Sequence, residues 1–90
     1  MAYRVDWLPA ARRMLRKLDP ATREHIVRAI LLLEGDPRPP GAKKLAGRDN
    51  LWRVRIGDHR VIYAIEDDRL LVVVVTVGHR REVYRGLRRR

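Results

Sequence analysis

The sequence predicts an α+β fold, in which a hairpin of two helices packs on a small, mostly antiparallel β-sheet. Tyr3, Val5 and Trp7 alternate with Ala2, Arg4 and Asp6, as in a strand with one buried face. Apolar residues then recur at helical spacing between residues 8 and 33. Three strand-like segments follow, near residues 51–56, 59–66 and 69–77. The expected order of elements is therefore β-α-α-β-β-β.

The two helices are marked at their ends. Pro9 opens the first helical pattern, whose solvent side is rich in arginine and lysine. Asp19 is a favourable N-cap for the second helix, and Pro20 stands at its first position. The second helix is expected to stop at Gly35-Asp36-Pro37. The link between the two helices is so short that they must run antiparallel. Their shared apolar stripe must then be buried against a sheet.

The remaining segments complete one small domain. A loop rich in proline and glycine spans residues 35–50. The run Leu70–Val75 has no alternation, which is typical of a central strand buried on both faces. After Gly78 we expect a short basic turn or helix, with residues 88–90 frayed. We expect residues 1–90 to form a single domain, because the chain is long enough for only one core.

Gly57 and Asp58 form a pair typical of a tight β-turn. If they are the two turn residues, Arg55 lies directly opposite Arg60, and Arg53 lies one pleat along on the same face. The same register pairs Trp52 with Tyr63 and Val54 with Val61 on the core face, and Arg53 with Ile62 on the other. A slip of one residue would move every one of these side chains to the other face.

Asp67 and Asp68 mark the next turn. With these two as the turn residues, Arg60 falls opposite Val75. The last strand then carries His79 and Arg80 toward the end of the sheet that holds the arginines.

Like charges directly opposed across strands destabilise a sheet, so folding alone gives no reason to collect Arg53, Arg55 and Arg60. A polyanion bound to that face would give one. The alternative is that three long side chains extend into water beside an apolar sheet.

Composition narrows the class of partner. Lys and Arg number 21 against 11 Asp and Glu, a formal net charge of +10, which indicates a phosphate-rich or acidic partner. The absence of cysteine excludes disulfides and thiolate metal sites and is compatible with a reducing cytoplasm. No signal-peptide core opens the chain, and the apolar run at residues 70–77 is too short to span a bilayer. We therefore expect a cytoplasmic protein with no membrane partner.

Several motifs, in this order and over nearly the whole chain, resemble the RelE branch of the RelE/ParE toxin superfamily. They are Lys44-Leu45, Trp52-Arg53-Val54-Arg55, Asp58-His59-Arg60-Val61-Ile62-Tyr63 and Val77-Gly78-His79-Arg80-Arg81-Glu82-Val83-Tyr84. RelE-like toxins of type II toxin–antitoxin systems cleave messenger RNA in the ribosomal decoding site and are silenced by a cognate antitoxin. The resemblance thus implies the ribosome, messenger RNA and an antitoxin protein as partners, and no small-molecule cofactor.

The resemblance also implies roles for single residues. Arg60 matches the phosphate-binding arginine, Arg80 the arginine that assists the leaving group, and Tyr84 the tyrosine that stacks on a base or orients the nucleophile. Arg53 and Arg55 occupy positions that are lysines in the best-known member, one of them proposed there as a general base. Lys43, Lys44 and Arg81 are candidates for RNA contact, or for solvated charge in the case of the two loop lysines.

RNA cleavage without a metal proceeds most simply by attack of the ribose 2′-hydroxyl on the adjacent phosphorus. Arginine is a poor general base. His79 is the most attractive candidate for proton transfer, because imidazole titrates near neutral pH; phosphate contact is its other possible role. The acidic residues show neither a paired-carboxylate arrangement nor metal-ligand spacing, so we expect the endoribonuclease that the resemblance implies to be independent of metal.

Two alternatives remain. A ParE-like toxin on the same fold would poison DNA gyrase and cut nothing, although such chains usually lack the arginine constellation. The second alternative is a degenerate module that binds RNA or an antitoxin and that lost catalysis when lysines became arginines.

Overall fold

The computed structural model describes residues 2–47 and 50–79. The elements follow the expected order, with a two-residue strand added in the proline-rich loop. They are β1 (Arg4–Trp7), α1 (Pro9–Arg16), α2 (Pro20–Leu31), a 3₁₀ turn (Leu32–Glu34), β2 (Lys43–Lys44), β3 (Leu51–Ile56), β4 (His59–Glu66), a second 3₁₀ turn (Asp67–Arg69) and β5 (Leu71–His79). None of the helices within these described ranges is long and apolar enough to cross a membrane.

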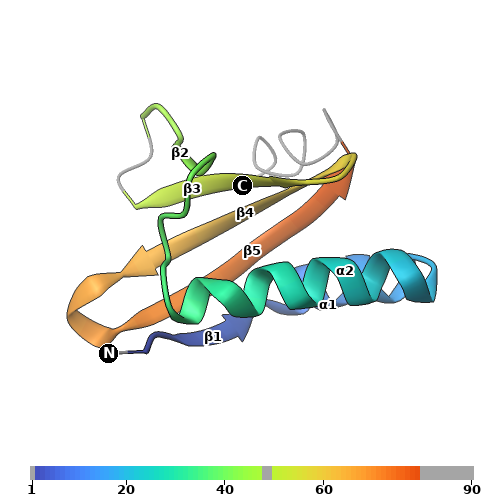
Figure 1. Cartoon of the computed structure of the whole chain (residues 1–90), viewed down its shortest axis with the longest axis horizontal. Helices are drawn as coiled ribbons and strands as arrows, with labels where there is room; N and C mark the ends of the chain where they lie inside the picture. Colours follow the sequence, from blue (N-terminus) through green and yellow to red (C-terminus); the bar gives the residue numbers. More distant parts are fainter. Residues whose placement is uncertain (1, 48–49, 80–90) are drawn as a thin grey trace.

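The five strands form one sheet in the order β1-β5-β4-β3-β2. β1 runs parallel to β5, and the other neighbours are antiparallel. Figure 1 shows α1 and α2 together on one side of this sheet. The predicted α+β class and the helical hairpin are therefore confirmed.

The main core lies between the helices and the sheet. Ile26 and Ile30 of α2 are buried against Val61, Tyr63 and Val74 of the two central strands. A second, smaller cluster forms on the other face of the sheet, around the buried residues Ile62 and Val75. β5 thus carries buried side chains on both faces, as its unbroken apolar run predicts.

Asp19 caps α2 as expected. Its carboxylate accepts hydrogen bonds from the Thr22 backbone N–H at 3.1 Å and from the Thr22 hydroxyl at 2.7 Å. These bonds hold the pKa of Asp19 below its ordinary value. The cap and Pro20 fix the start of α2, and hence the short link between the helices.

The β3–β4 register is the predicted one. Arg55 pairs with Arg60 and Arg53 with Ile62, on either side of the Gly57-Asp58 turn. Gly57 has a φ of +60°, which a residue with a Cβ adopts only at a cost. A two-residue turn with glycine at this position therefore sets the register of the whole hairpin.

The β4–β5 register predicted from a two-residue turn is wrong: Arg60 lies opposite Gly78, not Val75. Two features cause the three-residue shift. The turn contains four residues, because Asp67–Arg69 form a 3₁₀ turn and Leu70 follows with a φ of +49°. A bulge between Ile62 and Tyr63 then adds one more residue on β5. The expectation that His79 ends β5 beside the arginine hairpin holds, because His79 pairs with His59.

The β4–β5 turn is tied to the rest of the chain through Asp67. Its carboxylate accepts a hydrogen bond from the Tyr3 hydroxyl at 2.6 Å and two from the Arg38 guanidinium, at 2.8 and 3.1 Å. These partners hold the pKa of Asp67 at about 2, with the Arg38 bonds as the larger cause. Arg38 also lies over the Trp52 ring, 5.1 Å from its centroid. The network joins the residue before β1, the proline-rich loop and the β4–β5 turn.

Asp67 should make the stability of the fold depend on pH in the acid range. The pKa of Asp67 is lower in the folded protein than in the unfolded chain. Its contribution to the free energy of unfolding is therefore complete above the ordinary pKa of 3.8 and is lost as the pH falls toward 2. We expect Asp67→Asn to lower the melting temperature at pH 7 by a margin that shrinks steadily from pH 4 to pH 2. Thermal melts of wild type and variant across this range measure it. Asp68→Asn, in the same turn, is the matched control, and a margin independent of pH would contradict the assignment.

Candidate nucleic-acid interface

Four basic side chains share the face of the sheet that points away from the helices. We call this set, Lys43 of β2, Arg53 and Arg55 of β3 and Arg60 of β4, the arginine face. Lys43 pairs directly with Arg53, and Arg55 pairs directly with Arg60. Directly paired residues point to the same side of a sheet, and alternation along β3 puts Arg53 and Arg55 on one side. Three strands therefore contribute cations to one surface.

The arginine face has an apolar base. Ile62, which pairs with Arg53, belongs to the second apolar cluster, and Leu45 and Leu51 pack against that cluster. Arg55 is exposed, whereas Arg53 and Arg60 are half-buried. Half-burial restrains the long side chains and lets their stems cover apolar surface while the guanidinium groups remain polar. Such restraint suits a site that must present charge in a fixed geometry.

Within the described strands, the charged side chains of β2 and β3 are all basic. Glu66 is the only acidic residue of β4, and it lies at the far end of the strand, where Arg69 donates to it at 3.1 Å. Gly78, opposite Arg60, adds no side chain beside the guanidinium. The arrangement leaves a cationic surface on which a phosphate can approach the sheet closely.

The two histidines near this site lie on the other side of the sheet. His79 pairs with His59, and their ring centroids are 5.3 Å apart in an edge-to-face arrangement. Each lies two residues from a side chain that faces the helices, His59 from Val61 and His79 from Val77. Residues two apart in a strand point to the same side of the sheet. His59 is therefore on the core side, as its predicted register requires. His79 is at the expected end of the sheet but points away from the arginine face.

The structure separates the two loop lysines. Lys43 belongs to the arginine face, whereas Lys44 pairs with Trp52 and so points to the helix side. Arg80, Arg81 and Tyr84, the other predicted site residues, lie outside the described residues. Among residues 2–47 and 50–79, no three His, Asp or Glu side chains are grouped so that they could hold a metal ion.

Comparison with known proteins decides the family. The family model of the ParE toxin of type II toxin–antitoxin systems, parDE, matches residues 5–84. The chain belongs to the RelE/ParE toxin superfamily. Toxin RelG of Mycobacterium tuberculosis is 35% identical over 89 residues, covering 94% of this chain and 99% of RelG. The mRNA interferase toxin RelE of Escherichia coli is 31% identical over 88 residues, covering 93% and 92%.

Solved structures agree with this membership. A mutant of Escherichia coli toxin RelE in the free state aligns with a TM-score of 0.81 at 28% identity, covering 99% of this chain and 98% of RelE. RelE in the archaeal RelE–RelB complex from Pyrococcus horikoshii aligns with a TM-score of 0.79 at 28% identity, covering 89% and 97%. The fold of this RelE-like toxin is thus the fold of its relatives, with helices and sheet in the same arrangement.

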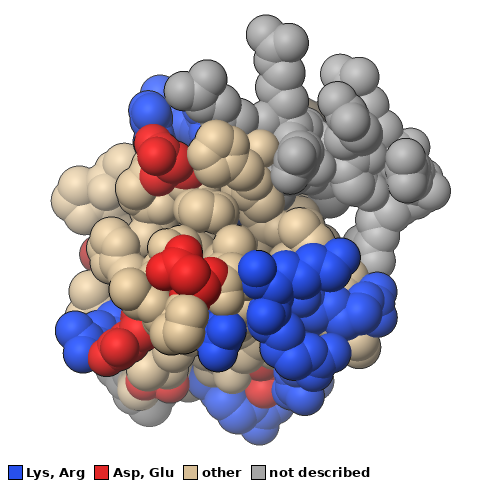
Figure 2. Space-filling view, turned by 90° about the vertical axis from the view of Figure 1, so that its right-hand side faces the viewer, with Lys and Arg blue, Asp and Glu red and all other residues tan. Residues whose placement is uncertain are grey.

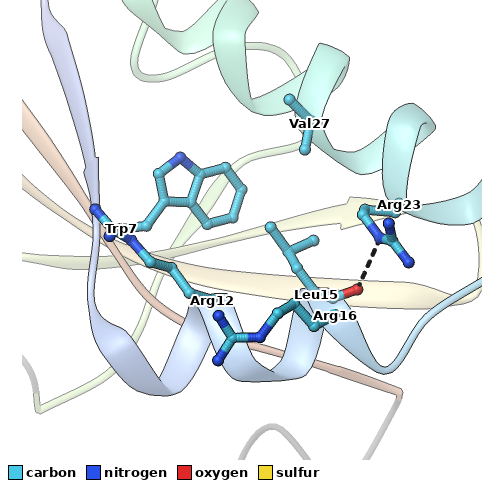
Figure 3. Close-up of a pocket in the computed structure, with 6 residues that line it drawn as sticks. All are labelled: Trp7, Arg12, Leu15, Arg16, Arg23 and Val27. Atoms are coloured by element: carbon cyan, nitrogen blue, oxygen red, sulfur yellow. Dashed lines mark hydrogen bonds between the residues drawn. The ribbon is translucent and has the colours of Figure 1, made fainter. Parts of the chain in front are cut away.

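Sequence reasoning noted the basic side of the first helix but missed a cavity beside it. We call it the helix cleft, a cavity of about 380 Å³ on the helix side of the sheet, shown in Figure 3. It is lined by Trp7, Arg12, Leu15, Arg16, Arg23 and Val27. The spacing of Arg12 and Arg16 on one helix was the only signal in the sequence, and it is equally typical of a solvated helix face.

Proposed function

We propose that this toxin is a ribosome-dependent endoribonuclease that cuts messenger RNA and is held inactive by a cognate antitoxin. The observation that carries the proposal is the direct opposition of Arg55 and Arg60, with Arg53 and Lys43 on the same face. Opposed like charges weaken a sheet, and a bound phosphate chain reverses that cost. The proposed site of action is the cytoplasm, where ribosomes translate.

The chemistry that suits this site is attack within the RNA itself. The ribose 2′-oxygen loses its proton and bonds to the adjacent phosphorus, while the bond from phosphorus to the 5′-oxygen breaks and that oxygen takes up a proton. The products are a 2′,3′-cyclic phosphate and a free 5′-hydroxyl. The phosphorane between them carries extra negative charge, and restrained guanidinium groups stabilise such charge as it develops.

Each proposed residue has a part in this reaction. Arg60 binds the scissile phosphate, with Arg53 and Arg55 neutralising the neighbouring oxygens and Lys43 holding the backbone. Arg80 assists the leaving group and Tyr84 stacks on a base or orients the nucleophile, the roles that the matching positions have in RelE-like toxins. Lys44 and Arg81 are further RNA contacts. His79 is the proposed group for proton transfer. Because it points away from the arginine face, it would have to act around the end of the sheet.

The names of the relatives support both parts of the proposal, the cleavage of messenger RNA and the binding of an antitoxin. A relative 31% identical to this chain is named an mRNA interferase toxin. RelE of Pyrococcus horikoshii, at 28% identity, has been solved in complex with RelB. The replacement of lysines by Arg53 and Arg55 keeps the positive charge and adds a planar, bidentate donor for phosphate.

A ParE-like gyrase poison is the second candidate. The description of the matching family model favours it, because that model is named for ParE. The same fold would then bind gyrase, and the arginine face would contact protein or DNA without catalysis.

Primer extension in a translating extract separates the candidates. Added toxin should produce cuts within codons at the ribosomal A site, and the same message without ribosomes should stay intact. Double-strand DNA breaks in expressing cells, with uncut messages, would instead establish the gyrase poison. A toxin that gives neither result would be a binding module.

The proposed chemistry uses protein side chains alone, so chelation should not affect it. We expect the rate of cleavage of a ribosome-bound message to be unchanged after the purified toxin has been dialysed against EDTA, when the assay contains only the magnesium that the ribosome needs. Loss of cleavage, restored by zinc or manganese but not by fresh magnesium, would contradict a metal-independent mechanism.

A further inference from the structure

Arginines also gather on the side of the sheet opposite the arginine face. The helix cleft lies between the end of β1, α1 and the start of α2. Figure 2 shows a dense field of Lys and Arg side chains on the end of the molecule that carries the α1–α2 turn. α1 and the residue that follows it contribute four exposed bases to this end, namely Arg12, Arg13, Arg16 and Lys17. Nothing in the proposed cleavage chemistry uses them.

The floor of the helix cleft is apolar. Trp7, Leu15 and Val27 are each half-buried, and in Figure 3 their side chains point into the same space. They come from three different elements, β1, α1 and α2. The space they enclose is large enough for an apolar side chain, and filling it would remove these three groups from water.

One of the three guanidinium groups that line the cleft is already fixed in place. Arg23 donates from Nε to the Leu15 carbonyl at 3.2 Å and from Nη2 to the Leu18 carbonyl at 2.8 Å. These carbonyls belong to the last turn of α1 and the residues that follow it, where a helix leaves acceptors without intrahelical partners. Because the guanidinium is held before any ligand arrives, little further side-chain entropy is lost when it binds an anion.

Arg12 and Arg16 stand one helical turn apart on the rim. Like charges at this spacing weaken a helix. No carboxylate lines the cleft, since its six lining residues include three arginines and no acidic side chain. An anionic ligand would therefore relieve a repulsion that none of the described residues lining the cleft compensates.

We propose that the helix cleft binds an acidic amphipathic segment of a protein partner. An apolar side chain of the segment fills the space over Trp7, Leu15 and Val27, and carboxylates one helical turn apart pair with Arg12 and Arg16. Since the proposed function includes a cognate antitoxin, this inference rests on that part of it and assigns the segment to the antitoxin. RNA fits less well, because a nucleotide has no aliphatic group for a floor made partly of Leu15 and Val27.

Binding of defined probes to the purified chain tests the proposal. The probe is a synthetic helical peptide with a leucine between two glutamates one turn apart. The comparison probes are the same peptide with glutamines for the glutamates, the same peptide with serine for the leucine, and an oligouridylate of eight nucleotides. Isothermal titration calorimetry gives the affinities. We expect the acidic peptide to bind, and both altered peptides to bind about tenfold more weakly or worse.

Paired charge reversals locate the site. Arg12→Glu with Arg16→Glu should weaken binding of the acidic peptide at least about tenfold. The matched control, Arg13→Glu with Lys17→Glu, makes the same charge change at the same spacing, in α1 and its C-cap, at residues that do not line the cleft. It should alter binding by no more than about twofold, because salt screens charges that are not in contact. Circular dichroism melts verify that both variants fold.

Three results would overturn the proposal. They are failure of the acidic peptide to bind, equal loss of binding in the two variants, and loss of oligouridylate binding alone in the cleft variant, which would make the cleft an RNA site. The titrations use neither ribosomes nor messages. A toxin without nuclease activity would therefore refute the cleavage proposal and leave this result unaffected.

Discussion

Replacement of Arg60 with alanine is expected to slow cleavage of ribosome-bound messages by about 10²- to 10³-fold, the usual cost of removing one donor from a charge-stabilising site. Arg60 is half-buried and lies at the centre of the proposed site, between Arg55 on one neighbouring strand and Gly78 on the other. Its side chain is not part of the buried core, so the fold should remain intact. Growth inhibition should disappear with the cleavage.

Single-turnover cleavage rates in a reconstituted translation system measure this effect. Arg60→Lys should retain part of the rate, because it keeps the charge but not the planar pair of donors. Arg4→Ala is the matched control, since Arg4 is an exposed arginine on the other edge of the sheet, in β1. Undiminished toxicity of Arg60→Ala would remove Arg60 from the mechanism.

Replacement of Tyr63 with alanine should lower the free energy of unfolding by about 3–5 kcal/mol, enough to unfold much of a small domain. Tyr63 is the largest fully buried side chain of the core. Its hydroxyl donates to the Pro37 carbonyl at 2.8 Å. Burial raises its pKa to about 12, so the hydroxyl stays protonated and able to donate over the whole physiological range.

The conservative change separates packing from hydrogen bonding. Tyr63→Phe keeps the ring and leaves the buried Pro37 carbonyl without this donor, at a cost of about 1–3 kcal/mol. Because Pro37 lies in the loop that leads to β2, the same change should loosen Lys43 relative to the arginine face. Urea unfolding gives both free energies. Equal stability of Tyr63→Phe and wild type would show that the hydrogen bond contributes nothing.

The parts of this fold that could be predicted are those with short-range causes. The Asp19 cap, the apolar period of the helices and the Gly57-Asp58 turn each act over a few residues. The turn alone fixes the strand register, and with it the opposition of Arg55 and Arg60. The α+β class then follows from the order of the elements.

The errors have long-range or conformational causes. The left-handed conformation of Leu70 is unusual for a leucine, and its side chain gives no sign of it in the sequence. The bulge at Ile62 and Tyr63 depends on how β5 packs, and the two-residue strand β2 depends on pairing with β3. The opposite orientation of His79 follows from strand alternation only once the true register is known.

The helix cleft could not be predicted for the same reason. Its residues come from three elements, and Arg23 is held there by the main-chain carbonyls of Leu15 in α1 and of Leu18 in the link after α1. No local pattern encodes that contact. On the arginine face, by contrast, three of the four cations belong to a single hairpin, so the sequence alone predicted their convergence.

Binding to ribosomes programmed with a modified message tests the central claim most directly. In that message a neutral methylphosphonate replaces the scissile phosphate, so no cleavage follows binding. Loss of the charge should weaken binding of wild-type toxin by about tenfold or more, and should have little effect on Arg60→Ala, which has already lost the contact. An equal loss for both proteins would show that Arg60 does not bind the scissile phosphate, and would contradict the account of the arginine face.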